Sequence, residues 1–164
     1  SFDWSPSSLP LSERRYPYTA LQRSSSFAAS FAGGLIGTVP MLYVLRRLGA
    51  HMTMFAVGAI SSLLCALTPQ TIALSFELLV ALRFVTGFVT IILFPVIGLI
   101  IEEWAGVQET GFFVAVLTAY LEIAPLFTLP VGSLIAEKVN WPTVFYVHGL
   151  ACALFTILWL MFYR

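Results

Sequence analysis

Residues 24–45 read SSSFAASFAGGLIGTVPMLYVL, a run of 22 residues without a charged side chain, and Arg46 and Arg47 follow it directly. About 20 mostly apolar residues are enough for an α-helix to cross the roughly 30 Å hydrocarbon layer of a membrane. The run therefore predicts a transmembrane helix. The basic pair predicts that this helix ends at the membrane surface, where Lys and Arg are common.

The composition extends this prediction to the whole chain. Of the 164 residues, 59% are hydrophobic and 10% are charged, with 8 basic and 8 acidic side chains. A soluble domain carries roughly 25% charged residues, so this chain cannot cover a water-facing surface with charge. Nucleic-acid binding is disfavoured, because no basic excess is present to neutralise phosphates. The remaining class is an integral, multi-pass membrane protein, and either the plasma membrane or an intracellular vesicle fits.

The charged residues divide the chain into five predicted transmembrane helices. They follow a polar loop or tail at residues 1–23 and lie at about residues 24–45, 51–68, 78–101, 110–136 and 141–163. A short loop is expected at residues 69–77, because Pro69 and Gln70 interrupt the second apolar run. Long uncharged runs favour helices over barrel strands, which alternate over about 10 residues. We expect an all-α bundle over residues 24–164, with sequential helices antiparallel.

Two charged residues fall inside predicted spans. Glu122 lies near the middle of the fourth, where a lipid-facing carboxylate costs at least about 2.5 kcal/mol. It is a candidate either for proton exchange in a transport cycle or for a structural hydrogen bond between helices. Arg83 lies about five residues into the third span, so it either snorkels to the interface or holds an anionic substrate. The helix rotations are unknown, which leaves an Arg83–Glu122 pair open.

Two groups of residues have a structural and a functional interpretation. Arg46, Arg47 and Gly49 connect the first two spans, either as an interfacial anchor or as a gating loop that binds a neighbouring helix end. Ala29, Gly33 and Gly37 place small residues every four positions on one helix face. This spacing is typical of close helix packing in membranes.

Metal, cofactor and enzyme chemistry have no support in the sequence. The two histidines are isolated, and both cysteines lie inside apolar runs, so no metal site and no cofactor is indicated. No phosphate-binding glycine loop with a lysine is present. No nucleophile and base occur together in an aqueous segment, so we do not expect an enzyme.

Six stretches have the order and separation of motifs of a known transporter family. They are Phe2-Asp3-Trp4-Ser5-Pro6, residues 40–50 with Arg46-Arg47-Leu48-Gly49, Arg83-Phe84-x-x-Gly87 with Phe94-Pro95, Glu103-Trp104-Ala105, Leu129-Pro130-x-Gly132, and Trp141-Pro142-x-Val144-Phe145-Tyr146-Val147-x-Gly149. Together they resemble the major facilitator superfamily. Within it, they resemble the anion:cation symporter family of sodium/phosphate cotransporters, sialin and vesicular glutamate transporters.

The resemblance implies that the five spans are helices two to six of a twelve-helix transporter. The partners would then be the first helix and the second half of the fold, the lipid bilayer, a small anionic solute and a co-transported proton or sodium ion. Transport would occur by alternating access between two halves, so we expect no transport by these 164 residues alone. The resemblance also assigns Arg46 and Arg47 to the cytoplasm and Arg83 to the substrate or coupling path.

The chain departs from the family pattern at two positions. Arg46 stands where the family usually has an acidic residue, which puts the charge pairing of that loop in doubt. Thr90 stands where many members carry a glutamate, so Thr90 is a pathway candidate and Glu122 a candidate replacement for the missing carboxylate. The alternative function is a short membrane protein that does not transport and acts as a helix-packing partner or scaffold.

Overall fold

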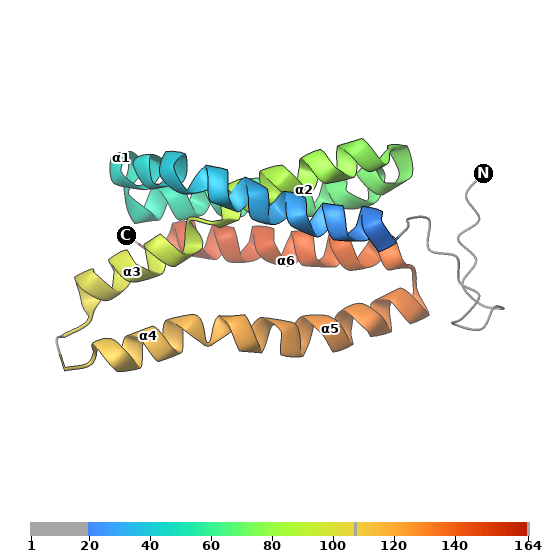
Figure 1. Ribbon diagram of the computed structural model, residues 1–164. Helices are drawn as coiled ribbons and strands as arrows, with labels where there is room; N and C mark the ends of the chain where they lie inside the picture. Colours follow the sequence, from blue (N-terminus) through green and yellow to red (C-terminus); the bar gives the residue numbers. More distant parts are fainter. Residues whose placement is uncertain (1–19, 107, 164) are drawn as a thin grey trace.

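The computed structural model describes residues 20–106 and 108–163, and all secondary structure in these residues is helical. The elements are α1 (Ala20–Leu74), α2 (Phe76–Thr90), α3 (Leu93–Trp104), α4 (Thr110–Thr118), α5 (Tyr120–Lys138) and α6 (Trp141–Phe162). Figure 1 shows them as long, nearly parallel rods. Of the predicted polar segment at residues 1–23, residues 1–19 lie outside the described part of the chain.

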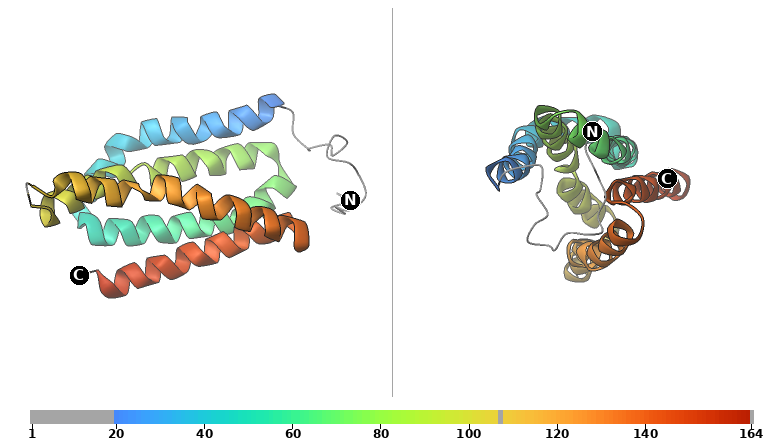
Figure 2. Two further views of the ribbon diagram at one scale, coloured as in Figure 1. Left: turned by 90° about the horizontal axis from the view of Figure 1, so that it is seen from below. Right: turned by 90° about the vertical axis from the view of Figure 1, so that its right-hand side faces the viewer.

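The helix α1 is two helices joined at Gly49. This glycine has φ 74° and ψ 171°, a conformation that is essentially reserved for glycine. The two halves, residues 20–48 and 50–74, run in opposite directions with α2 between them (Figure 2). The described residues therefore form four apolar helices of membrane-span length, and the first folds back on itself and supplies two passes. This arrangement confirms the predicted all-α membrane bundle.

The predicted loop at residues 69–77 is wrong. The helix continues through Pro69 to Leu74, and only Ser75 separates it from α2. Proline removes one backbone donor, but membrane helices tolerate this loss where neighbours and hydroxyls satisfy the freed groups. The turn is made instead by Ser75, whose side chain accepts a 3.3 Å hydrogen bond from the backbone N–H of Leu78 as the N-cap of α2.

The remaining long helices are also interrupted. A turn at Ile91 and Ile92 separates α2 from α3, and Pro95 lies in the first turn of α3, where a missing N–H costs little. A turn at Ala119 separates α4 from α5. The backbone N–H of Glu122 donates to the carbonyl of Ala119 at 3.1 Å, a tighter spacing than in a regular α-helix.

The core lies where both halves of α1 meet α2 and α3. Its buried residues are apolar side chains near the Gly49 turn: Met41, Leu45, Ala50, Val57, Val89, Ile92 and Val96. Ile92, at the break between α2 and α3, is completely inaccessible. The helix α6 lies along the second half of α1, where the Ser62 hydroxyl donates to the carbonyl of Gly149 at 2.7 Å.

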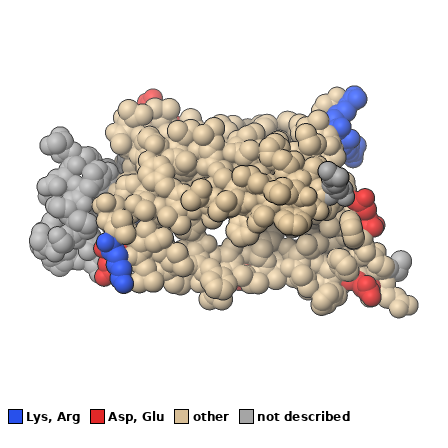
Figure 3. Space-filling view, turned by 180° about the vertical axis from the view of Figure 1, so that it is seen from behind, with Lys and Arg blue, Asp and Glu red and all other residues tan. Residues whose placement is uncertain are grey.

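The pair α4–α5 forms a separate layer. Neither helix has a buried residue, although together they span 29 residues. Figure 3 shows an opening through the molecule between this layer and the rest. On the face in view, the Lys, Arg, Asp and Glu side chains gather towards the two ends of the molecule. This charge distribution is that of a membrane-spanning protein.

Candidate functional site

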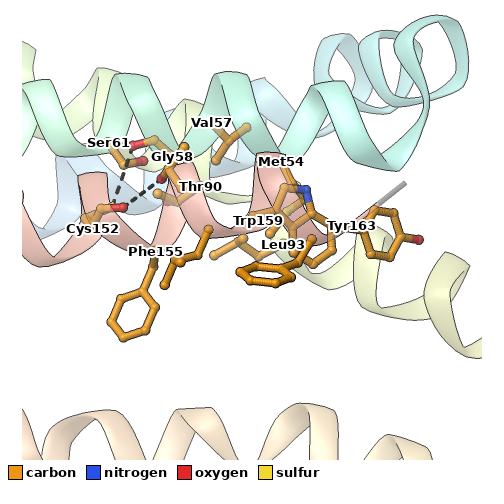
Figure 4. A pocket seen from close by; sticks show the side chains of 13 residues that line it. Met54, Val57, Gly58, Ser61, Thr90, Leu93, Cys152, Phe155, Trp159 and Tyr163 are labelled. Carbon is orange, nitrogen blue, oxygen red and sulfur yellow. Dashed lines mark hydrogen bonds between the residues drawn. The ribbon is translucent and has the colours of Figure 1, made fainter.

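A cavity of about 720 Å³ lies between the second half of α1, the α2–α3 break and α6. We call it the groove; Figure 4 shows it from close by. The second half of α1 contributes Met54, Val57, Gly58 and Ser61, α2 and α3 contribute Thr90 and Leu93, and α6 contributes residues from Cys152 to Tyr163. Four helices therefore form one apolar groove.

The polar groups of the groove are few, and most of them are bonded within the protein. The hydroxyl of Thr90 donates to the carbonyl of Thr86 at 2.8 Å, and that of Thr156 donates to the carbonyl of Cys152 at 2.7 Å. The hydroxyl of Ser61 is buried and has no hydrogen-bond partner among the described residues. Ser61 is therefore the hydroxyl of the groove that is left without a hydrogen bond among the described residues.

Aromatic residues close the groove at the end near Gly49. Trp159 and Tyr163 stack with ring centroids 4.2 Å apart, and Tyr163 stacks on His51 at 6.0 Å. The indole N–H of Trp159 donates to the backbone carbonyl of His51 at 3.3 Å. These contacts fasten the end of α6 to the start of the second half of α1.

The structure places Arg83 on α2, half-exposed and about 10 Å from the helix start at Phe76, given a rise of 1.5 Å per residue. Arg83 and Thr90 are seven residues apart and therefore share one face of α2. Thr90 lines the groove, whereas Arg83 lies two turns away towards the end of the helix that starts at Phe76.

Glu122 lies in the first turn of α5 and is exposed. It is about 18 Å from the start of α4 and about 24 Å from the end of α5, so it lies at mid-depth. Its carboxylate has no hydrogen bond or ion pair with any described residue. The Arg83–Glu122 pair that the sequence left open is therefore not formed among the described residues.

The predicted gating loop forms the turn inside α1. Arg46, Arg47 and Gly49 are all exposed. The Nε of Arg47 donates to the hydroxyl of Tyr43 at 3.1 Å, and its guanidinium lies 5.3 Å from the centre of that ring. Arg47 is thus held on its own helix, and neither arginine bonds to another described helix.

The predicted packing residues lie on the side of α1 that faces α2. Gly33 and Gly37 face the backbone of Phe84 and Phe88, and Ala29 borders a shallow hollow against α2 near Phe84. A methyl group on Gly37 would lie 2.6 Å from the Phe88 carbonyl oxygen. Glycine at these positions allows the two helices to approach closely.

Sequence reasoning missed the small residues that bring α6 against α1. A methyl group on Gly149 would lie 3.2 Å from the carbonyl oxygen of Ser62, and one on Gly58 would collide with Thr156. Their signal was present: Gly58, Ser61, Ser62 and Cys65 place small residues at successive turns of one helix. The same spacing of small residues occurs at Ala29, Gly33 and Gly37.

An all-helical bundle of membrane-length apolar helices around an internal groove defines an integral, multi-pass membrane protein. The sequence profile of the Major Facilitator Superfamily matches residues 3–164, and the chain belongs to this family. This result confirms the family indicated by the motifs. The family is one of transporters rather than enzymes.

Named relatives are similar along most of this chain. Sialin of Ovis aries is 25% identical over 148 residues, which are 90% of this chain and 30% of the relative. Sodium-dependent phosphate transport protein 3 of Mus musculus is 24% identical over 144 residues, 88% of this chain and 30% of the relative. Vesicular glutamate transporter 2 of Homo sapiens is 24% identical over 133 residues, 81% of this chain and 22% of the relative. The chain spans less than a third of the length of these relatives.

Proposed function

We propose that the chain forms part of a secondary active transporter that carries a small anion across a membrane. The observation that carries this proposal is the groove, which Ser61 and Thr90 line in a chain of a transporter family. Thr90 lies on the same face of α2 as Arg83. The names of proteins similar to this chain include glutamate, phosphate and urate, all of which are anions. Either a proton or a sodium ion would be co-transported.

Each candidate residue has a physical role in this proposal. The planar guanidinium of Arg83 binds a carboxylate or phosphate through two parallel hydrogen bonds. Ser61 and Thr90 offer hydroxyls deeper in the membrane. Glu122 exchanges the coupling proton, while the turn at Arg46, Arg47 and Gly49 gates one end of the path. Alternating access requires a second half of the fold that moves against this one.

The test is uptake of labelled phosphate, glutamate or urate into vesicles. The protein translated from the whole native reading frame should transport one of them, and the 164-residue chain should not. Arg83→Gln should lower uptake about 10- to 100-fold, since a hydrogen bond to a charged group contributes about 1.5–3 kcal/mol. Arg83→Lys keeps the positive charge but loses the planar guanidinium that makes two parallel hydrogen bonds, so it should rescue uptake only partly. Uptake that is unchanged in Arg83→Gln would contradict the proposed role.

Thr90 and Thr86 provide a matched pair on the same helix. Both hydroxyls donate to the carbonyl four residues earlier at 2.8 Å, but only Thr90 lines the groove. Thr90→Val should raise the KM for the anion severalfold, whereas Thr86→Val should leave it unchanged. Equal effects of the two substitutions would assign Thr90 a structural role only.

Glu122→Gln tests the coupling role. If Glu122 carries the proton, the variant loses the pH dependence of uptake and keeps exchange of labelled for unlabelled anion, because exchange needs no net proton movement. Loss of uptake with an unchanged pH dependence would argue against this role. Control vesicles should contain Glu137→Gln, a carboxylate one residue from the end of α5.

A further inference from the structure

A second cavity, separate from the groove, lies between the first half of α1 and the start of α2. We call it the hollow; its volume is about 500 Å³, and no residue lines both cavities. Its lining residues are mostly small or apolar: Ala29 of α1 and Phe76, Glu77, Val80, Ala81, Phe84 and Val85 of α2. One turn after Ala29, Gly33 brings α1 against the backbone of Phe84. The hollow is therefore the gap that remains between two helices just before they touch.

The hollow has about the depth of one leaflet of a membrane. Its residues on α2 fall in pairs four residues apart, so they share one face of the helix. Phe76 and Val85 are nine residues apart, which is about 14 Å along the axis at 1.5 Å per residue. Half of a hydrocarbon layer of roughly 30 Å is about 15 Å. Both helices start at the same end of the molecule (Figure 2), so the hollow extends inwards from that end.

One charged side chain lines the hollow. Glu77 is the second residue of α2, directly after the turn at Ser75, and charges are expensive inside hydrocarbon, so we place it at the membrane surface. Its side chain is exposed, and its carboxylate has no hydrogen bond or ion pair with another described residue. The other lining side chains are Ala, Val and Phe. The hollow is therefore apolar along its length and negatively charged at its outer end.

A phospholipid matches both properties of the hollow. An acyl chain fills the gap that the small side chains of Ala29 and Ala81 leave, and it supplies the dispersion contacts that an empty gap would lack. The headgroup of the same molecule stays at the membrane surface, beside Glu77. The occupant is therefore a lipid whose headgroup carries a group that binds a carboxylate.

The carboxylate of Glu77 distinguishes the common headgroups. Phosphatidylethanolamine carries a primary ammonium, whose N–H groups donate charge-assisted hydrogen bonds to a carboxylate. Phosphatidylcholine has the same charges, but its quaternary ammonium has no N–H to donate. Phosphatidylserine and phosphatidylglycerol carry a net negative charge, which a carboxylate repels. Phosphatidylethanolamine therefore fits Glu77 best.

We propose that the hollow is a binding site for one phosphatidylethanolamine molecule, with an acyl chain between Ala29 and Ala81 and the ammonium group on Glu77. This lipid differs from the surrounding bilayer lipid because Glu77 selects its headgroup. The site shares no residue with the groove, so it holds whether or not the protein transports an anion.

Photolabelling in vesicles tests the proposal. The chain would be reconstituted in phosphatidylcholine vesicles that contain a small fraction of a probe lipid with a photoreactive diazirine in one acyl chain. Two probes with identical acyl chains would be compared, one with an ethanolamine and one with a choline headgroup. Digestion and mass spectrometry then measure how much label the segment of α2 around Ala81 and Val85 carries.

The ethanolamine probe should label this segment about two- to fivefold more than the choline probe, which is the ratio that an exposed ion pair gives. Glu77→Gln should abolish the difference between the probes. Glu137→Gln should keep it, because Glu137 is an exposed carboxylate at the same end of the molecule that lines neither cavity (Figure 1).

A second pair of substitutions tests the hollow itself. Ala81→Phe fills the gap with a large side chain, so labelling of the segment by the ethanolamine probe should fall severalfold. Leu78→Phe adds a ring on the same helix at a position that is also exposed but does not line the hollow, and it should leave the labelling unchanged. Circular dichroism of each variant checks that the helices are retained.

Equal labelling by the two probes in the unsubstituted chain would overturn the proposal, because no headgroup would then be selected. A preference that survives Glu77→Gln in a folded variant would remove the carboxylate from the site. A segment of α2 without any label would mean that protein, and not lipid, covers the hollow. None of these readouts depends on uptake, so failure here and failure of the transport proposal are distinguishable.

Discussion

Gly37 lies directly against the backbone of α2, and this contact makes a quantitative stability prediction. A Cβ on Gly37 would lie 2.6 Å from the carbonyl oxygen of Phe88 and 2.9 Å from its Cα. Ordinary contact begins at 3.4 Å, so Gly37→Ala forces the helices apart by roughly 0.8 Å. A gap of 0.5–1 Å costs the facing atoms about a quarter to a half of their dispersion energy. Measured overpacking costs are about 1–3 kcal/mol.

Gly34→Ala is the matched control. Gly34 lies on the same helix, but its Cβ would meet the nearest atom, the carbonyl oxygen of Gly87, at 3.6 Å. Both substitutions bring the same helix-propensity gain of about 0.8–1 kcal/mol. The difference in free energy of unfolding between the two variants therefore isolates the contact. We expect Gly37→Ala to be about 1–3 kcal/mol less stable than Gly34→Ala.

The measurement is reversible unfolding in mixed detergent micelles, followed by circular dichroism. The expected difference corresponds to a roughly 5- to 150-fold change in the unfolding equilibrium constant, since 1.4 kcal/mol is tenfold. Two variants of equal stability would refute the reasoning. That result would mean that α1 and α2 are not in contact at Gly37 in the membrane.

Two further stability predictions come from matched pairs. Ser62→Ala loses the 2.7 Å hydrogen bond to the carbonyl of Gly149, so it should lower the free energy of unfolding by about 0.5–1.5 kcal/mol. Ser61→Ala removes a hydroxyl that has no hydrogen bond among the described residues, so it should be neutral or stabilising. A larger loss from Ser61→Ala would contradict this. Gly49→Ala should lower the free energy of unfolding by about 1–3 kcal/mol, because Gly49 has φ 74° and ψ 171°. Gly98 has open space around it, so Gly98→Ala should not lower the free energy of unfolding. Equal losses from the two substitutions would mean that Gly49 does not form the turn.

The positions along the chain where most membrane helices end could be predicted from the sequence. Charges mark where a membrane helix ends, because they are expensive in hydrocarbon. Arg46 and Arg47 predicted the reversal that the structure places at Gly49. The predicted loop at Pro69 is wrong, because the proline lies inside an uncharged apolar run and the helix continues through it to Leu74. Without a charge, one lost hydrogen bond was not enough to end the helix.

The rotation of each helix, and which helices lie side by side, could not be predicted in the same way. In a soluble protein an apolar stripe shows which face of a helix is buried. Here lipid accepts apolar side chains on every face, so hydrophobicity carries no information about rotation. The separate α4–α5 layer could not be predicted for this reason, since most of its residues are apolar and no apolar stripe marks a buried face. Small residues are the exception, because close approach requires them, and Gly33 and Gly37 were found by that signal.

Arg83 and Glu122 show why depth and rotation must be separated when a site is inferred. Both were placed inside spans from their distance to the nearest helix end, and the structure keeps both there. Whether they meet depends on rotation and on which helices are neighbours, and they do not meet among the described residues. Arg83 is half-exposed on α2, whereas Glu122 is exposed on α5 and has no donor among the described residues. The depth of a charged residue can be predicted from the sequence, because charges are expensive in hydrocarbon. Its pairing cannot, because pairing depends on the rotation of each helix and on which helices are neighbours.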